Sequence, residues 1–195
     1  MARSREGNYA KRVGRGPQLG ALFVLALVLN GCAAWGDEEV DLRAARELDA
    51  YPLYWAGERF EGWELAQVEL RESGFSTLVY GTCTPHGGDE PSCVPPVQIQ
   101  IQPLCSHLEA VTRAPIWRRR EIRGAPVGTI DSAPVLLSRR AQIKVCRGEG
   151  TDAGAPGRVL SSLRSLNDVA PVLSDGERIP AAPRSVLDGT RPCAS

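Results

Sequence analysis

Long apolar runs, histidines and lysines are scarce in this chain of 195 residues. The longest apolar run, residues 19–29, has eleven residues, well short of the roughly 20 that a membrane-spanning helix needs. Only Lys11 and Lys144 are lysines among the 23 basic residues. We interpret the excess of arginine, beside abundant alanine, glycine and proline, as a codon bias rather than as selection for phosphate binding.

Motifs of the common enzyme classes are also missing. The sequence contains no P-loop, no G-x-S-x-G and no H-E-x-x-H. A Ser-His-Asp site would have to be assembled from His86 or His107, Ser92 or Ser106, and Asp89 or Asp131. A glycosidase-like carboxylate pair would come from Glu58, Glu61, Glu64 and Glu69, and such pairs arise by chance in a charged domain. We expect no cofactor, and keep a small envelope hydrolase only as the alternative to a non-enzymatic role.

The N-terminus has the pattern of an export signal. Residues 3–15 hold five basic residues and one acidic residue, and the apolar run of residues 19–29 follows, which has the length of a signal-peptide core. The run leads into Leu29-Asn30-Gly31-Cys32, which resembles a bacterial lipobox. The resemblance implies that residues 1–31 are removed and that the Cys32 thiol carries a diacylglycerol. Two acyl chains anchor a protein stably to a membrane, so we expect the extracytoplasmic face of the cell membrane.

The charge of the remaining chain argues against nucleic acid as a partner. The leader holds five of the 23 basic and one of the 23 acidic residues, so residues 32–195 carry 18 basic and 22 acidic residues, a net charge of −4. Nucleic-acid binders usually carry a basic patch. The expected partners are membrane lipid through Cys32 and a cell-wall component or protein of the envelope.

Composition divides the mature chain into three parts. Residues 32–50 are expected to form a tether and a short helix from Asp37 to Leu48. Residues 51–173 form the domain proper, and the Pro-, Ala- and Gly-rich residues 174–195 are expected to form an extended tail on the surface.

The domain is predicted to be mainly antiparallel sheet. In residues 97–102, valine and two isoleucines alternate with three glutamines, which indicates a half-buried strand. Further strands are predicted at residues 51–55, 63–70, 76–80, 121–130 and 141–146. Residues 156–166 place leucine and valine at helical spacing. We therefore predict an α+β fold with an antiparallel sheet of about five to six strands, one main helix and disulfides.

Five cysteines remain besides Cys32, and an extracytoplasmic location permits them to form disulfides. Cys83 and Cys93 flank a Gly- and Pro-containing loop between two predicted strands, so they form the favoured pair. Cys105 is paired with Cys146 in preference to Cys193, since each ends a predicted strand. The alternative for the loop is a metal site of Cys83, His86 and Cys93, whose ligand types suit zinc or copper. Its spacing contains no C-x-x-C, so we favour the disulfide.

An aromatic cluster offers a candidate binding surface. Five aromatic residues lie within thirteen positions: Tyr51, Tyr54, Trp55, Phe60 and Trp63. Exposed rings such as Tyr54, Trp55, Phe60 and Trp63 could stack on a sugar or a peptide. The alternative is that these rings belong to the core of a small sheet.

Three segments of the domain also resemble a group of small secreted or lipidated actinobacterial proteins of unknown function. They are Tyr-Pro-Leu-Tyr-Trp at residues 51–55, Tyr-Gly-Thr-Cys at 80–83, and Cys-Val-Pro-Pro-Val-Gln-Ile-Gln at 93–100. This resemblance implies architecture and location, and no activity or catalytic residue.

Overall fold

The computed structural model describes residue 40 and residues 42–71, 74–82, 94–113, 115–173 and 176–193. These residues belong to one compact unit, Glu39–Ser195. The export signal, Cys32 and the predicted Cys83–Cys93 loop lie outside the described residues. Within the described part of the chain, none of the helices combines the length and apolarity needed to cross a bilayer.

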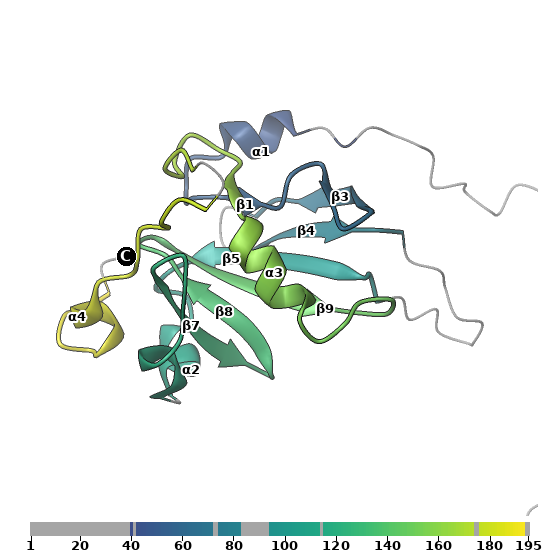
Figure 1. Ribbon diagram of the computed structural model, residues 1–195. Helices are drawn as coiled ribbons and strands as arrows, with labels where there is room; N and C mark the ends of the chain where they lie inside the picture. Colours follow the sequence, from purple (N-terminus) through teal and green to yellow (C-terminus); the bar gives the residue numbers. More distant parts are fainter. Residues whose placement is uncertain are drawn as a thin grey trace, which may run out of the picture. The chain divides into compact units, whose positions relative to one another are not determined.

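The described residues form one antiparallel sheet of eight strands in the order β2-β3-β4-β5-β9-β8-β7-β6, together with a two-stranded sheet of β1 and β10 (Figure 1). The strands of the large sheet are β2 (Arg59–Phe60), β3 (Trp63–Glu69), β4 (Ser76–Tyr80), β5 (Val97–Pro103), β6 (Glu121–Ile122), β7 (Ala125–Ile130), β8 (Ala133–Leu137) and β9 (Ala141–Arg147). The small sheet pairs β1 (Tyr54–Trp55) with β10 (Arg164–Ser165). The predicted antiparallel sheet is confirmed, but it has more strands than predicted.

Helices are short in the described chain. They are α1 (Arg43–Glu47), α2 (Leu108–Thr112), the 3-10 helix η1 (Pro115–Arg118), α3 (Ala155–Ser162) and α4 (Arg184–Leu187). The expectation of one main helix is therefore only loosely met, because the longest, α3, has eight residues. α1 begins at Arg43, so it is shorter than the helix predicted from Asp37.

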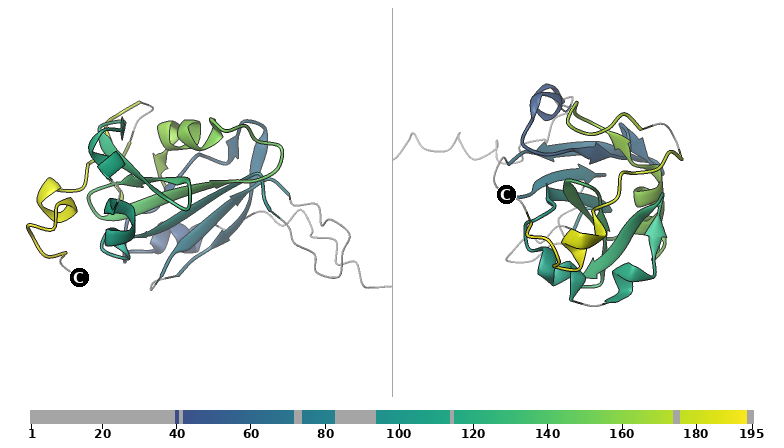
Figure 2. Two further views of the ribbon diagram at one scale, coloured as in Figure 1. Left: turned by 90° about the horizontal axis from the view of Figure 1, so that it is seen from below. Right: turned by 90° about the vertical axis from the view of Figure 1, so that its left-hand side faces the viewer.

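The sheet separates two cores. On one face, alternate residues such as Val97, Ile99 and Ile101 are buried under α3, in a large core that also holds Val159 and Leu160. Figure 2 shows α3 lying across this face. Val135 and Leu137 of β8 point to the other face because strand side chains alternate. There they form a second, smaller core with residues of α2, η1 and α4.

Tight turns explain the strands that the sequence pattern did not predict. Three hairpins turn on two residues with positive φ, namely Glu61-Gly62, Arg123-Gly124 and Asp131-Ser132. This pattern is that of a type I′ turn, which suits the twist of antiparallel strands. The turn at Arg123-Gly124 divides the single strand predicted for residues 121–130 into β6 and β7.

The C-terminal residues are packed rather than lying as a simple surface tail. Ala181 forms a β-bridge with Ser138, next to the end of β8. The backbone N–H of Ala182 donates to the carbonyl of Leu137 at 3.0 Å. Ile179 and Leu187 are buried. The sheet therefore continues its hydrogen bonding into the last described segment.

Candidate binding site

Three rows of side chains cross the sheet on the face opposite the large core. Each row joins a glutamine of β5 to a polar residue of β9: Gln98 with Cys146, Gln100 with Lys144, and Gln102 with Gln142. Strand residues two apart share a face, which is why the alternating glutamines line up. The second core covers part of this face over β7 and β8, and the side chains of Gln98 and Gln100 remain partly exposed.

A hollow of about 670 Å³ lies over two of these rows, Gln100 with Lys144 and Gln102 with Gln142. Its lining comes from the sheet, from the segment before β4 and from the turn before α2: Gly74, Phe75, Gln100, Gln102, Ser106, His107, Ala110, Ile130, Val135, Gln142 and Lys144. This volume falls within the range of small-ligand sites in proteins, roughly 300–1,000 Å³. We define this group of residues as the glutamine hollow.

Gln142 builds one wall of the glutamine hollow. Its side chain is only 1 % exposed, and its amide nitrogen donates to the carbonyls of Leu104 (2.5 Å) and Ser106 (2.6 Å). Its amide oxygen accepts a bond from Gln102 Nε2 at 3.3 Å. Since a glutamine amide has two N–H donors, both are used here. Gln142 therefore fixes the turn that carries Ser106 and His107.

Other polar groups of the hollow are not used by the fold. Among the described residues, the side-chain amide of Gln100 makes no hydrogen bond, and neither does that of Gln98, which lies outside the lining of the hollow. Lys144 Nζ lies 3.8 Å from a carboxylate oxygen of Asp131, whose side chain is 87 % exposed. Exposed ion pairs of this length contribute little, so these groups are available to a ligand.

Phe75 adds an aromatic ring beside these polar groups. It is 45 % exposed, which is unusual for a large apolar side chain in this structure. The next residue, Ser76, pairs with Ile101, so Phe75 lies beside Gln102 on the same face of the sheet.

No protein-family model, curated protein or solved structure matches this chain.

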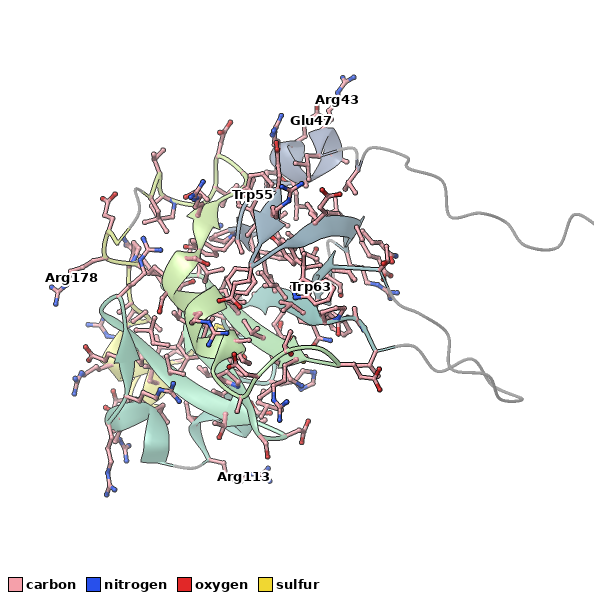
Figure 3. All side chains as sticks on the ribbon, turned by 45° about the vertical axis from the view of Figure 1, so that its right-hand side comes forward. Arg43, Glu47, Trp55, Trp63, Arg113 and Arg178 are labelled. Atoms are coloured by element: carbon pink, nitrogen blue, oxygen red, sulfur yellow. A yellow bond between two sulfur atoms is a disulfide. The ribbon has the colours of Figure 1, made fainter. Side chains whose placement is uncertain are left out.

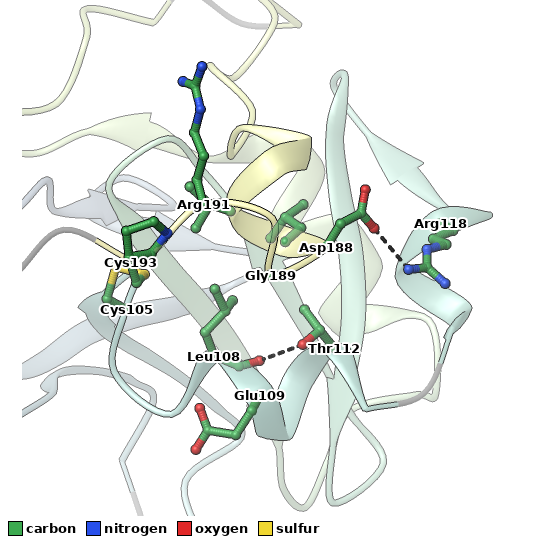
Figure 4. Close-up of a pocket in the computed structure, with 12 residues that line it drawn as sticks. Cys105, Leu108, Glu109, Thr112, Arg118, Asp188, Gly189, Arg191 and Cys193 are labelled. Atoms are coloured by element: carbon green, nitrogen blue, oxygen red, sulfur yellow. Dashed lines mark hydrogen bonds and ion pairs between the residues drawn. A yellow bond between two sulfur atoms is a disulfide. The ribbon is translucent and has the colours of Figure 1, made fainter.

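A second hollow, of about 510 Å³, lies between α2 and the C-terminal segment (Figure 4). Its polar groups are already engaged or diverge. Arg118 forms an ion pair with Asp188 at 2.8 Å, and the Thr112 hydroxyl donates to the carbonyl of Leu108. The charged ends of Glu109 and Arg191 point away from each other. This hollow thus offers a ligand fewer converging groups than the glutamine hollow does.

The structure places most of the predicted aromatic cluster in the core. Tyr51, Tyr54 and Phe60 are buried, so Tyr54 and Phe60 are corrected from binding candidates to core residues. Trp55 and Trp63 are half-buried and pack against the large core. Figure 3 shows them at separate places on different strands. Because they do not form one stacking platform, the binding hypothesis moves from this cluster to the glutamine hollow.

The predicted pairing of Cys105 with Cys146 is wrong. Cys105 forms its disulfide with Cys193, with a Cα–Cα distance of 5.6 Å. Cys146 is a free, half-buried thiol on the polar face. Burial raises the pKa of the Cys146 thiol above its ordinary value, so the thiol is protonated at neutral pH and a weak nucleophile.

The metal and hydrolase alternatives gain no support from the described residues. No group of three or more potential metal ligands occurs within them, and the proposed Cys83, His86 and Cys93 set lies outside them. Ser106 and His107 both line the glutamine hollow, but no hydrogen bond among the described residues joins them to each other or to Asp131. Three of the four candidate carboxylates are paired with arginine: Glu61 with Arg158, Glu64 with Arg59, and Glu69 with Arg71.

The sequence contained a signal for part of this site. The glutamines of β5 were predicted to share one face, and they do. Phe75, Gln142 and Lys144 were missed because their places depend on strand pairing between segments far apart in the chain.

Proposed function

We propose that this chain is a lipid-anchored protein of the extracytoplasmic membrane face, and that it binds a polar ligand of the cell envelope without catalysing a reaction. The glutamine hollow is the observation that carries the binding part. It combines the unused amide of Gln100, the ammonium group of Lys144 and the exposed ring of Phe75 on one face of the sheet, which is the mixture of groups found in ligand sites.

The location rests on the sequence and gains support from a crosslink. The basic leader, the apolar run and Cys32 give the lipobox pattern. The Cys105–Cys193 disulfide supports an oxidising compartment, because disulfides rarely persist in a reducing cytosol.

The anchor is tested by the intact mass of the protein extracted from its native membrane. We expect a chain that starts at Cys32 and carries a diacylglycerol increment. A chain without lipid, or one that retains residues 1–31, would contradict the anchor.

The binding role is tested by retention of the full chain, purified in detergent, on isolated cell envelope. We expect Gln100→Ala to reduce retention at least about threefold, since one hydrogen bond contributes around 1 kcal/mol. Gln67→Ala is the matched control, because Gln67 is an exposed glutamine of β3 outside the hollow. Equal retention of both variants and the unchanged protein would remove the hollow from the proposal.

A further inference from the structure

The charge of the glutamine hollow favours an anionic ligand. Among the described residues that line it, Lys144 carries the permanent charge, and no carboxylate is present. Lys144 pairs with Asp131 at 3.8 Å, and Asp131 lies outside the lining. The Asp131 side chain is 87 % exposed, so solvent screens this pair. A cation in a partly enclosed site attracts an acidic group more strongly than one in open solvent does.

The uncharged groups favour a ligand that is rich in hydroxyls. A primary amide supplies donors and an acceptor close together, so Gln100 can bind hydroxyl groups in either direction. The side-chain nitrogen of Gln102 donates to the Ser106 carbonyl and to Gln142 Oε1, and among the described residues no group donates to its side-chain oxygen. Gln100 and Gln102 therefore place donors and acceptors side by side in the hollow.

Phe75 supplies a flat apolar surface beside these amide groups. Sugar rings have an apolar face of C–H groups, and such faces pack on aromatic rings. Neighbouring strands are about 4.8 Å apart. Phe75, Gln102 and Gln142 lie side by side across β4, β5 and β9, so together they span about 10 Å. This length accommodates a short oligosaccharide.

We infer that the glutamine hollow binds a glycan that carries carboxylate groups, with a sugar ring stacked on Phe75, hydroxyls bound to the amides of Gln100 and Gln102, and a carboxylate paired with Lys144. This inference rests on the proposed binding function and specifies its ligand class. An acidic peptide is the competing ligand, and the test below separates the two.

The test uses calorimetric titration of the full chain in detergent with trigalacturonate, and with its methyl ester as the uncharged match. We expect the acid to bind more tightly than the ester. Lys144→Gln keeps a long polar side chain and should weaken binding of the acid at least about fivefold while leaving the ester unchanged. Phe75→Ala should weaken both ligands by about the same factor.

Two control variants lie away from the hollow. Arg178→Gln removes one positive charge from an exposed position, and Val172→Ala truncates an exposed apolar residue. Both should bind the acid as the unchanged protein does. An equal loss with Arg178→Gln would show that net charge, and not Lys144, causes the preference, and would overturn the inference.

The inference and the proposed function can fail separately. If Gln100→Ala lowers envelope retention but the unchanged protein binds neither sugar, or binds hexaglutamate at least as tightly as trigalacturonate, the function stands and the glycan assignment is wrong. If the hollow variants change neither retention nor sugar binding, both are wrong.

Discussion

At the scale of single residues, one buried amide joins segments far apart in the sequence. Asn167 is 4 % exposed. Its nitrogen donates to the carbonyls of Leu48 (2.7 Å) and Tyr51 (3.0 Å). Its oxygen accepts the backbone N–H of Leu53 at 2.8 Å, and that of Ala170 at 3.3 Å. The side chain thus replaces the regular strand pairing that this part of the N-terminal segment lacks.

We expect Asn167→Ala to lower the free energy of unfolding by about 3 kcal/mol, because it leaves several buried backbone groups without partners. Urea unfolding followed by circular dichroism measures the change. Asp168→Ala is the control, since Asp168 is the exposed neighbour and its loss should have little effect. Similar midpoints for the two variants would show that water replaces the amide.

A charged residue gives a prediction about pH. Hydrogen bonding to Arg158, with help from the backbone N–H of Gly154, lowers the pKa of Asp152 to about 2. A carboxyl whose pKa is lower in the folded state stabilises the fold above its unfolded pKa, near 3.9, and this contribution disappears as the pH falls through about 2.

We therefore expect Arg158→Gln to raise the pKa of Asp152 part of the way towards its ordinary value, because the Gly154 bond remains. Carboxyl NMR titration measures it. The difference in stability between the two proteins should shrink between about pH 4 and pH 2. An unchanged Asp152 pKa would show that the backbone bond alone sets it.

At the scale of elements, a glycine permits a helix to lie close to a strand. A Cβ atom on Gly128 of β7 would be 2.5 Å from Val111 Cγ1 and 3.1 Å from the Val111 carbonyl oxygen. Val111 belongs to α2 and is fully buried in the second core. α2 can therefore sit on β7 only because residue 128 has no side chain.

Gly128→Ala is expected to destabilise the protein by about 2 kcal/mol, as overpacking of a close contact usually does. Combining Gly128→Ala with Val111→Ala tests whether the clash with Val111 causes this loss, because an alanine at position 111 leaves room for the added methyl group. A double-mutant cycle of unfolding free energies should show that the double variant loses less than the two single losses together. If the losses of the two single variants simply add in the double variant, the contact with Val111 is not the source of the strain.

The elements that sequence predicts well are those with local patterns. β5 extends the predicted strand by one residue, because alternation over several positions marks it. β4 matches residues 76–80, a short run rich in β-branched, leucine and tyrosine side chains that precedes a glycine. β2 and β10 have two residues each and carry no periodicity. β8 was not predicted because it contains Pro134, and proline has no N–H to donate to a neighbouring strand. The structure accommodates Pro134 because the pairing of β8 with β9 starts only at Val135. The glutamine hollow needs the register of β4, β5 and β9, which no local pattern contains.

At the scale of the whole described unit, the disulfide closes the second core. Cys105 follows β5, and Cys193 lies 88 residues later. Between them the C-terminal segment pairs with Ser138 and buries Leu187 against Leu108 and Trp117. Cys105 also lies beside Ser106 and His107, so the crosslink borders the turn that forms one wall of the glutamine hollow.

Replacing both Cys105 and Cys193 by serine is expected to lower the free energy of unfolding by about 4.5 kcal/mol, the chain-entropy value for a loop of this length. Urea unfolding followed by Trp117 fluorescence measures it, because Trp117 is buried in the second core. The unchanged protein under dithiothreitol should match the double variant. Cys146→Ser is the control, since it removes the free thiol and keeps the crosslink.

The variant with both Cys105 and Cys193 replaced by serine also tests whether the disulfide stabilises the second core or only fixes the end of the chain. If the crosslink holds the second core together, its loss should speed tryptic cleavage after Arg184 and Arg191 of the C-terminal segment. The large core should stay folded, because Cys193 packs against the second core and not against the large one. Cleavage rates equal to those of Cys146→Ser would show that the β-bridge and the apolar contacts suffice without the disulfide. In that case the hollow wall at His107 would also keep its place when the protein is reduced.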